Sequence, residues 1–241
     1  MDNPITNAKI WLGKYDLSSY HNRVECSGKC AILDGTTFGK STHVKQPGLK
    51  ELEVVGGGFW DLSETEARPD KYINELLAVA NTPLTIALPG STTGAAAHLM
   101  RVIVAGYRPA AQIGNILRFE LTAEANNASG VGHVLDYRAM AAAGTVTSTP
   151  FEVGALAAGQ TLRATLHVFA FSATSLIVKL QSDNAATFLS PTDRGTFKMI
   201  TATDADWMSS TSVVTDTWWR ISATLTGGAG TATFAVALAV N

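Results

Sequence analysis

Short stretches in which apolar and polar residues alternate, bounded by Gly, Pro, Asn and Asp, dominate the first half of the chain. Alternation with a period of two is typical of strands with one buried face, because successive side chains point to opposite faces of a sheet. The stretches in question are AKIWLGKYDL, NRVECSGKCAIL, ELEVVGGGFW, PLTIALPG, HLMRVIVAGY and NILRFELTAEA. This pattern predicts a mainly β protein.

One segment has a helical period instead. In PDKYINELLAVANTP the apolar residues Tyr72, Leu76 and Val79 fall on one stripe, as expected of a helix packed on a core. Pro69 suits a first helical turn, and Pro83 follows the stripe where a helix should have ended. We therefore expect one helix over about 69–80.

The texture changes after residue 125. The small, polar run NNASGVG predicts a linker at 126–132. Beyond it, short strand-like stretches recur without a helical pattern between them, which is typical of a sandwich or jelly roll. The pattern thus predicts a β domain with one helix over 1–125 and an all-β domain over 133–241. The apolar run TATFAVALAV is too short to span a bilayer and predicts a buried strand.

Composition narrows the classes of function. A net charge of −2 with 16% charged residues excludes the basic footprint of a nucleic-acid-binding protein. The low charge and the mean hydropathy of +0.13 have two interpretations. Other subunits cover much of the surface, or the chain is simply a β protein rich in Ala, Gly and Thr.

Motifs for catalysis or for cofactor binding are absent from the sequence. No Gly-x-Ser-x-Gly elbow occurs, and Gly39-Lys40-Ser41 lacks the preceding glycine of a phosphate loop. Cys26 and Cys30 have neither redox nor zinc spacing, and we expect two reduced, half-buried thiols. We therefore expect no enzyme, no cofactor and no metal site. A hydrolase with dispersed His and Asp residues is the least favoured alternative.

Two groups of residues suggest close contacts. Three consecutive glycines, Gly56–Gly58, predict a bulge or the close approach of another backbone. Three tryptophans, Trp207, Trp218 and Trp219, are candidate exposed aromatic contacts, for a sugar, for another protein or under a neighbouring loop. Because neighbouring residues of a strand point to opposite faces, at most one of Trp218 and Trp219 lies in the core.

The polar stretch Asp34–Gly48 separates two predicted strands. Most hairpin loops take about two to five residues, so this connection is long. From the residues alone it is either a loop packed on its own domain or a segment that reaches another subunit.

A resemblance to a known family bears on this choice. The stretches IWLGKYDLSSYHNRVE and LDGTTFGKSTHVKQPGLKELEVVGGGFWD, with the helix and VGHVL after them, resemble structural proteins of tailed bacteriophages. The second half, with LHVFAFSATSLIVKLQSDNAATFLSPTDR, WWRIS and FAVALAV, is also similar to such proteins. The first domain resembles the tail-tube (major tail protein) family, which implies a small β barrel or sandwich with one flanking helix. The second domain would be an added β module.

The resemblance implies a role in the virion tail. The subunit would be made in the host cytoplasm and would form homo-oligomeric rings. The rings would stack into a tube, contact other phage structural proteins and let DNA pass without sequence-specific binding or a membrane. The long stretch would be an inter-subunit arm, formed by Asp34, Thr36, Thr37, Phe38, Gly39, Lys40, Pro47 and Gly48. It would be ordered only by its neighbour. The alternatives are a capsid decoration protein, a head–tail completion protein, or a carbohydrate-binding adhesion module.

Overall fold

The computed structural model describes residues 7–60, 69–110 and 112–241. Strands dominate these residues, which confirms the mainly β prediction. The elements are β1 (Lys9–Leu12), β2 (Tyr15–Asp16), β3 (His21–Asp34), β4 (Lys45–Phe59), α1 (Pro69–Leu76), β5 (Thr82–Ala87), β6 (Ala96–Ala110), β7 (Arg118–Met140), β8 (Gly144–Thr147), β9 (Phe151–Glu152), β10 (Leu162–Phe171), β11 (Ser175–Asp183), β12 (Thr192–Thr196), β13 (Ala205–Ser210), β14 (Trp218–Thr226) and β15 (Ala232–Val240).

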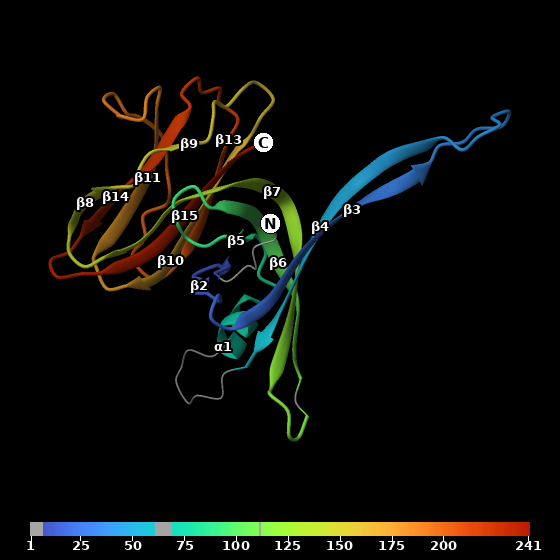
Figure 1. Ribbon diagram of the computed structural model, residues 1–241, viewed down its shortest axis with the longest axis horizontal. Helices are drawn as coiled ribbons and strands as arrows, with labels where there is room; N and C mark the ends of the chain where they lie inside the picture. The colour runs from blue at the N-terminus through green and yellow to red at the C-terminus, as the bar shows by residue number, and fades with distance from the viewer. Residues whose placement is uncertain (1–6, 61–68, 111) are drawn as a thin grey trace, which may run out of the picture. The chain divides into compact units, whose positions relative to one another are not determined.

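The chain divides into two compact units that alternate along the sequence. Unit 1 contains Met1–Ser19, Asn81–Arg101 and Asn127–Asn241, and unit 2 contains Tyr20–Ala80 and Val102–Asn126. Strands β6 and β7 each begin in one unit and continue into the other. Figure 1 shows both strands as long ribbons.

Unit 1 is built around two antiparallel sheets. One has the order β13-β10-β15-β7 and continues through β6, β5, β1 and β2. The other has the order β12-β11-β14-β8, with β9 beside β14. Large apolar side chains of both sheets form one buried cluster, including Leu166 and Phe234 from the first sheet and Leu180 and Ile221 from the second. Residues 133–241 therefore include a sandwich, as the sequence predicts.

Strand β15 is covered on both faces. Phe234, Val236 and Leu238 belong to the cluster between the sheets. The alternate residues Ala235, Ala237 and Ala239 belong to a second cluster around Trp11. The prediction of a buried strand at the end of the sequence is confirmed. Large and small residues alternate along β15 because its two faces pack against different clusters. Neither face is exposed to solvent.

The glycines of NNASGVG have a packing role inside β7. Residues 126–132, expected to form a linker, continue this strand without interruption. A Cβ atom added at Gly132 would lie 2.0 Å from the backbone oxygen of Leu238 on β15. Glycine is therefore required where the two backbones approach each other.

A buried histidine fastens the first strands of unit 1 to β10. His167 is fully buried, and its Nδ1 donates to the backbone oxygen of Gly13 over 2.8 Å. Its Nε2 lies 2.8 Å from the hydroxyl of Thr85, which also contacts the hydroxyl of Thr165. Burial lowers the pKa of His167 to about 4, so the ring is neutral at pH 7.

Unit 2 contains a sheet in which β4 lies between β3 and the first part of β7. One face is apolar and includes Val54, Phe119 and Leu121, which are buried. Within the described residues β3 pairs only with β4, so this sheet has an open edge and does not close into a barrel. Of the two architectures expected here, the barrel is therefore not formed.

The single helix of the described residues is shorter than predicted. It begins at Pro69, as expected, but ends at Leu76 rather than near residue 80. Ala78 has a φ of 61°, in the left-handed region, and its backbone nitrogen donates to Val104 of β6 over 3.0 Å. This tertiary hydrogen bond ends the helix although the apolar period continues through Val79.

The glycine run of β4 meets a neighbouring backbone, as predicted. A Cβ atom at Gly58 would lie 1.8 Å from the carbonyl oxygen of Tyr20. The β3–β4 register also shifts between His21 and Arg23, which marks a bulge. Of the two alternatives predicted for this run, the close backbone approach is confirmed at Gly58, and a bulge lies on β3 opposite the run.

Candidate assembly surface

The β3–β4 hairpin continues well beyond the sheet of unit 2. The pairing of β4 with β7 ends at Glu53 and Glu124, whereas β3 and β4 stay paired as far as Asp34 and Lys45. We call residues Gly28–Leu52, which pair only with one another, the hairpin arm. Its β3 strand from Gly28 to Asp34 spans roughly 20 Å at about 3.3 Å per residue. Figure 1 shows the hairpin arm running away from the other strands of unit 2.

Nearly the whole hairpin arm is exposed on both faces. Only Gly48 and Leu52 are half-buried. Its large apolar side chains are exposed as well: Ile32 (68%), Leu33 (56%), Phe38 (109%), Val44 (38%) and Leu49 (83%). A two-stranded ribbon has no core of its own, and clustered exposed apolar residues mark interaction sites. The hairpin arm is therefore the strongest candidate for a contact surface.

Side-chain hydrogen bonds close the tip of the hairpin arm. Asp34 accepts from the backbone nitrogen of Thr36 over 2.9 Å and from the Thr36 hydroxyl. Its other carboxylate oxygen lies 3.1 Å from Nδ1 of His43, and the Thr36 oxygen accepts from the backbone of Val44 over 2.9 Å. These bonds, chiefly those from Thr36, lower the pKa of Asp34. The tip is thus organised by its own residues, with Phe38 pointing into solvent.

The loop at this tip is shorter than the sequence suggests. Thr36, Thr37, Phe38, Gly39 and Lys40 lie in the connection between the strands, as predicted. Pro47 and Gly48, expected in the same loop, belong to β4. A proline is tolerated there because β4 is an edge strand in the hairpin arm. On the opposite strand, the register shift between Cys30 and Ile32 brings Ala31 close to Gly48. A Cβ atom added at Gly48 would lie 3.0 Å from Ala31, which is a tight contact.

The two thiols also lie on this hairpin. Cys26 pairs with Val54 just inside the sheet, and Cys30 pairs with Lys50 in the hairpin arm. Both are free, as predicted, but they are exposed rather than half-buried. The expectation of partial burial assumed that both strands belonged to a packed sheet.

The tryptophans do not form one exposed surface. Trp219 is fully buried, and its indole nitrogen donates to the backbone oxygen of Gly154 over 2.8 Å. The prediction of an exposed contact at Trp219 is therefore wrong, while its neighbour Trp218 is half-buried on the opposite face of β14. Trp207 is half-buried on β13, in the other sheet, and packs against the cluster around Trp11.

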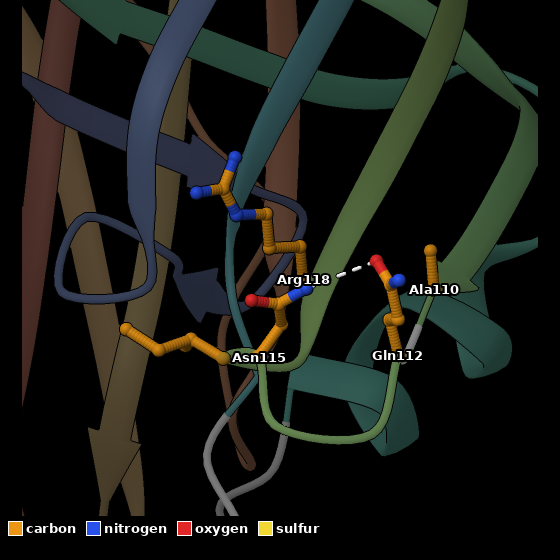
Figure 2. Close-up of a pocket in the computed structure, with 5 residues that line it drawn as sticks. Ala110, Gln112, Asn115 and Arg118 are labelled. Carbon is orange, nitrogen blue, oxygen red and sulfur yellow. Dashed lines mark hydrogen bonds between the residues drawn. The ribbon is translucent and has the colours of Figure 1, made fainter.

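A second exposed tip, at the β6–β7 turn of unit 2, was missed in the sequence. Ile113 and Ile116 are 104% and 66% exposed. An open hollow of about 620 Å³ lies at this tip (Figure 2), and it is lined by Ala110, Gln112, Asn115, Ile116 and Arg118. The Asn115 amide donates to the Gln112 side chain over 2.9 Å. The sequence pattern does separate the stretches HLMRVIVAGY and NILRFELTAEA, and Gly114 between them is a turn signal, but that signal does not indicate which apolar residues the turn exposes.

The described residues offer little for catalysis. No group of three or more His, Cys, Asp and Glu side chains in them could hold a metal ion. His133 contacts Phe151 and the backbone oxygen of Gly94, so its surroundings are structural. Among the described residues, no helix is long and apolar enough to cross a membrane.

Comparisons with known proteins give structural neighbours only. No protein-family model and no curated protein matches the sequence. Among solved structures, a chain from the virion of a native gene transfer agent particle is 11% identical, with a TM-score of 0.43 over 54% of this chain and 98% of that one. A chain of the SPP1 tail tube is 8% identical, with a TM-score of 0.43 over 55% and 81%. The SPP1 Dit protein, described as a hub adsorption apparatus of phages that infect Gram-positive bacteria, is 15% identical, with a TM-score of 0.38 over 95% and 98%.

Proposed function

We propose that the protein is a non-enzymatic structural subunit of a phage tail, and that it assembles with copies of itself through the hairpin arm. In this proposal the subunits form rings that stack into a tube, and DNA passes through the lumen. The observation that carries the proposal is the hairpin arm, a paired ribbon with large apolar side chains in water. The sequence resemblance to tail-tube proteins supplies the class of assembly.

The free energy available from burying the hairpin arm favours a closed ring of subunits over a single pair. Burial of the three most exposed apolar side chains of the hairpin arm, Ile32, Phe38 and Leu49, contributes about 1.5–3 kcal/mol each, or about 5–9 kcal/mol together. Association costs about 4–15 kcal/mol in lost freedom of the subunits. One such contact is therefore close to balance. A closed ring, in which every subunit both gives and receives a hairpin arm, makes more contacts for the same loss of freedom.

The proposal is tested by removing the apolar side chains of the hairpin arm. The double variant Phe38→Asp/Leu49→Asp should remain folded, because both side chains are exposed, and should lose assembly. The matched control is Leu189→Asp/Met199→Asp, which places the same two charges at positions in unit 1 that are 86% and 61% exposed. Negative-stain electron microscopy and light-scattering mass, over a range of protein concentrations, report the assembled state.

The outcomes separate the candidate roles. Rings or hollow tubes for the unaltered protein and for the control, with monomers for the double variant, support a tail-tube subunit. Shortening the tip within Thr36–Gln46 should have the same effect as the double variant. A compact trimer or a single ring that does not stack would instead support a capsid decoration or head–tail completion protein. A monomer at every concentration would refute assembly and turn attention to binding of glycans by this chain.

A further inference from the structure

A groove lies where the hairpin arm joins the sheet of unit 2. Ser27, Lys29, Lys50, Glu51, Leu52, Glu53, Glu124 and Ala125 line this hollow of about 490 Å³. These residues come from β3, β4 and β7, and all of them belong to unit 2. We call this hollow the base groove.

Two carboxylates lie side by side in the base groove. Glu53 and Glu124 are direct partners in the β4–β7 register, so their Cβ atoms are only about 4.5–5.5 Å apart. Like charges at such positions destabilise a sheet. Lys29 lies 3.8 Å from Glu53 and offsets part of this repulsion. Within the described residues the side chain of Glu124 has no ion pair or hydrogen bond, and three glutamates line the groove against two lysines.

The tip of the hairpin arm carries the opposite charge. Lys40 and Lys45 are both exposed, and neither side chain makes an ion pair within the described part of the chain. The one carboxylate of the tip, Asp34, is already held by Thr36 and His43. Residues 34–46 therefore have two lysines against one aspartate, a formal excess of one positive charge. The exposed Phe38 lies two residues before Lys40 and adds an apolar anchor.

We propose that the tip of the hairpin arm of one copy docks on the base groove of a second copy, with Lys40 and Lys45 beside Glu124 and Glu53. This inference rests on the proposed function, assembly through the hairpin arm, and assigns the receiving surface. A copy does not fill its own base groove, because its paired ribbon holds the tip roughly 20 Å away. The contact joins two different surfaces, so it repeats from copy to copy and closes into a ring or continues as a filament.

Charge reversal tests the pairing in the full chain. The double variants Glu53→Lys/Glu124→Lys and Lys40→Glu/Lys45→Glu should each raise the protein concentration needed for assembly at least about tenfold. The quadruple variant that combines all four changes restores opposite charges at both pairs and should return assembly to within about threefold of the unaltered protein. The control Glu152→Lys reverses an exposed charge on β9 of unit 1 and should leave assembly unchanged.

A second measurement separates a docking role from a folding role. Glu124→Gln removes one of two neighbouring carboxylates, so it should raise the urea midpoint of the monomer while it weakens assembly. A purely structural glutamate would lower the midpoint or leave both quantities unchanged. Assembly should also weaken as salt increases from about 0.05 to 0.5 M, because screening shortens the reach of charges from about 14 to about 4 Å.

The results distinguish the two proposals. If the unaltered protein does not assemble, the proposed function and the docking site both fail. If Phe38→Asp/Leu49→Asp abolishes assembly but the charge reversals leave it unchanged, the hairpin arm is an assembly element and the base groove is not its receiver. Loss of assembly by both reversals without recovery in the quadruple variant would likewise overturn the pairing.

Discussion

The buried histidine of unit 1 makes stability depend on pH in a defined direction. His167 uses both ring nitrogens, toward Gly13 and Thr85, and the neutral ring fits this arrangement. Protonation would place a positive charge in a site without solvent, and the pKa is accordingly lowered from 6.5 to about 4. In the unfolded chain the same ring takes up a proton near pH 6.5. Between these values the unfolded state binds more protons, so stability falls as the pH is lowered.

The size of this effect follows from the two pKa values. The difference is about 2.5 units, and each unit corresponds to about 1.36 kcal/mol. Through His167, lowering the pH from 6.5 to 4 should therefore reduce the free energy of unfolding of unit 1 by about 3 kcal/mol. Above pH 7 this residue should make no such contribution. That is a large fraction of the stability of an ordinary domain, about 5–15 kcal/mol.

The assay is urea unfolding followed by tryptophan fluorescence at several pH values between 7.5 and 4. Trp11 is a local reporter, because its ring lies 6.0 Å from the ring of His167. The variant His167→Gln keeps a donor and an acceptor but does not titrate, so its stability should fall less steeply. Burial raises the pKa of Asp136, which acts in the opposite direction, but this residue is present in both proteins and cancels in the comparison. Equal slopes for the two proteins, or a measured His167 pKa near 6.5, would refute the reasoning.

Two further changes probe the packing of unit 1, each measured by urea unfolding. Gly132→Ala should lower the free energy of unfolding by about 1–3 kcal/mol, because the added Cβ would overlap the backbone of β15. The control Gly106→Ala should lower it much less, because no atom lies closer than 3.7 Å to a Cβ added there. An equal loss from both would contradict the close approach of β7 and β15. Trp219→Ala should cost about 3–5 kcal/mol and Trp218→Ala clearly less, because only Trp219 is fully buried. The opposite order would mean that the two faces of β14 are assigned the wrong way round.

Local pattern predicted those features that depend on local physics. The alternation in TATFAVALAV identified β15 as buried, and Gly58 marked a close approach, because both follow from the side-chain period and from the lack of a Cβ. Neighbouring tryptophans on a strand were known to face opposite ways. Which of them is inside depends on the register of β14, however, and the sequence does not encode that register locally.

The features that were missed depend on distant partners. The helix ends early because Ala78 bonds to Val104, 26 residues further along the chain. Pro47 and Gly48 have the composition of a turn, yet a bulge on the opposite strand admits them to β4. The base groove brings together Glu53 and Glu124, and only the pairing of β4 with β7 reveals that they are neighbours. The spacing of Glu53 and Glu124 in the sequence does not indicate that they lie close together.

The position of β15 also governs how the chain reaches its native state. Both apolar clusters of unit 1 include residues of this strand, which follows every other strand of the unit in sequence. The contact between His167 and Gly13 likewise joins residues 154 positions apart. Unit 1 therefore has a high contact order, and the entropy of closing these long loops is lost before its core is complete. We expect slow refolding of unit 1, during which its half-formed sheets expose strand edges to aggregation.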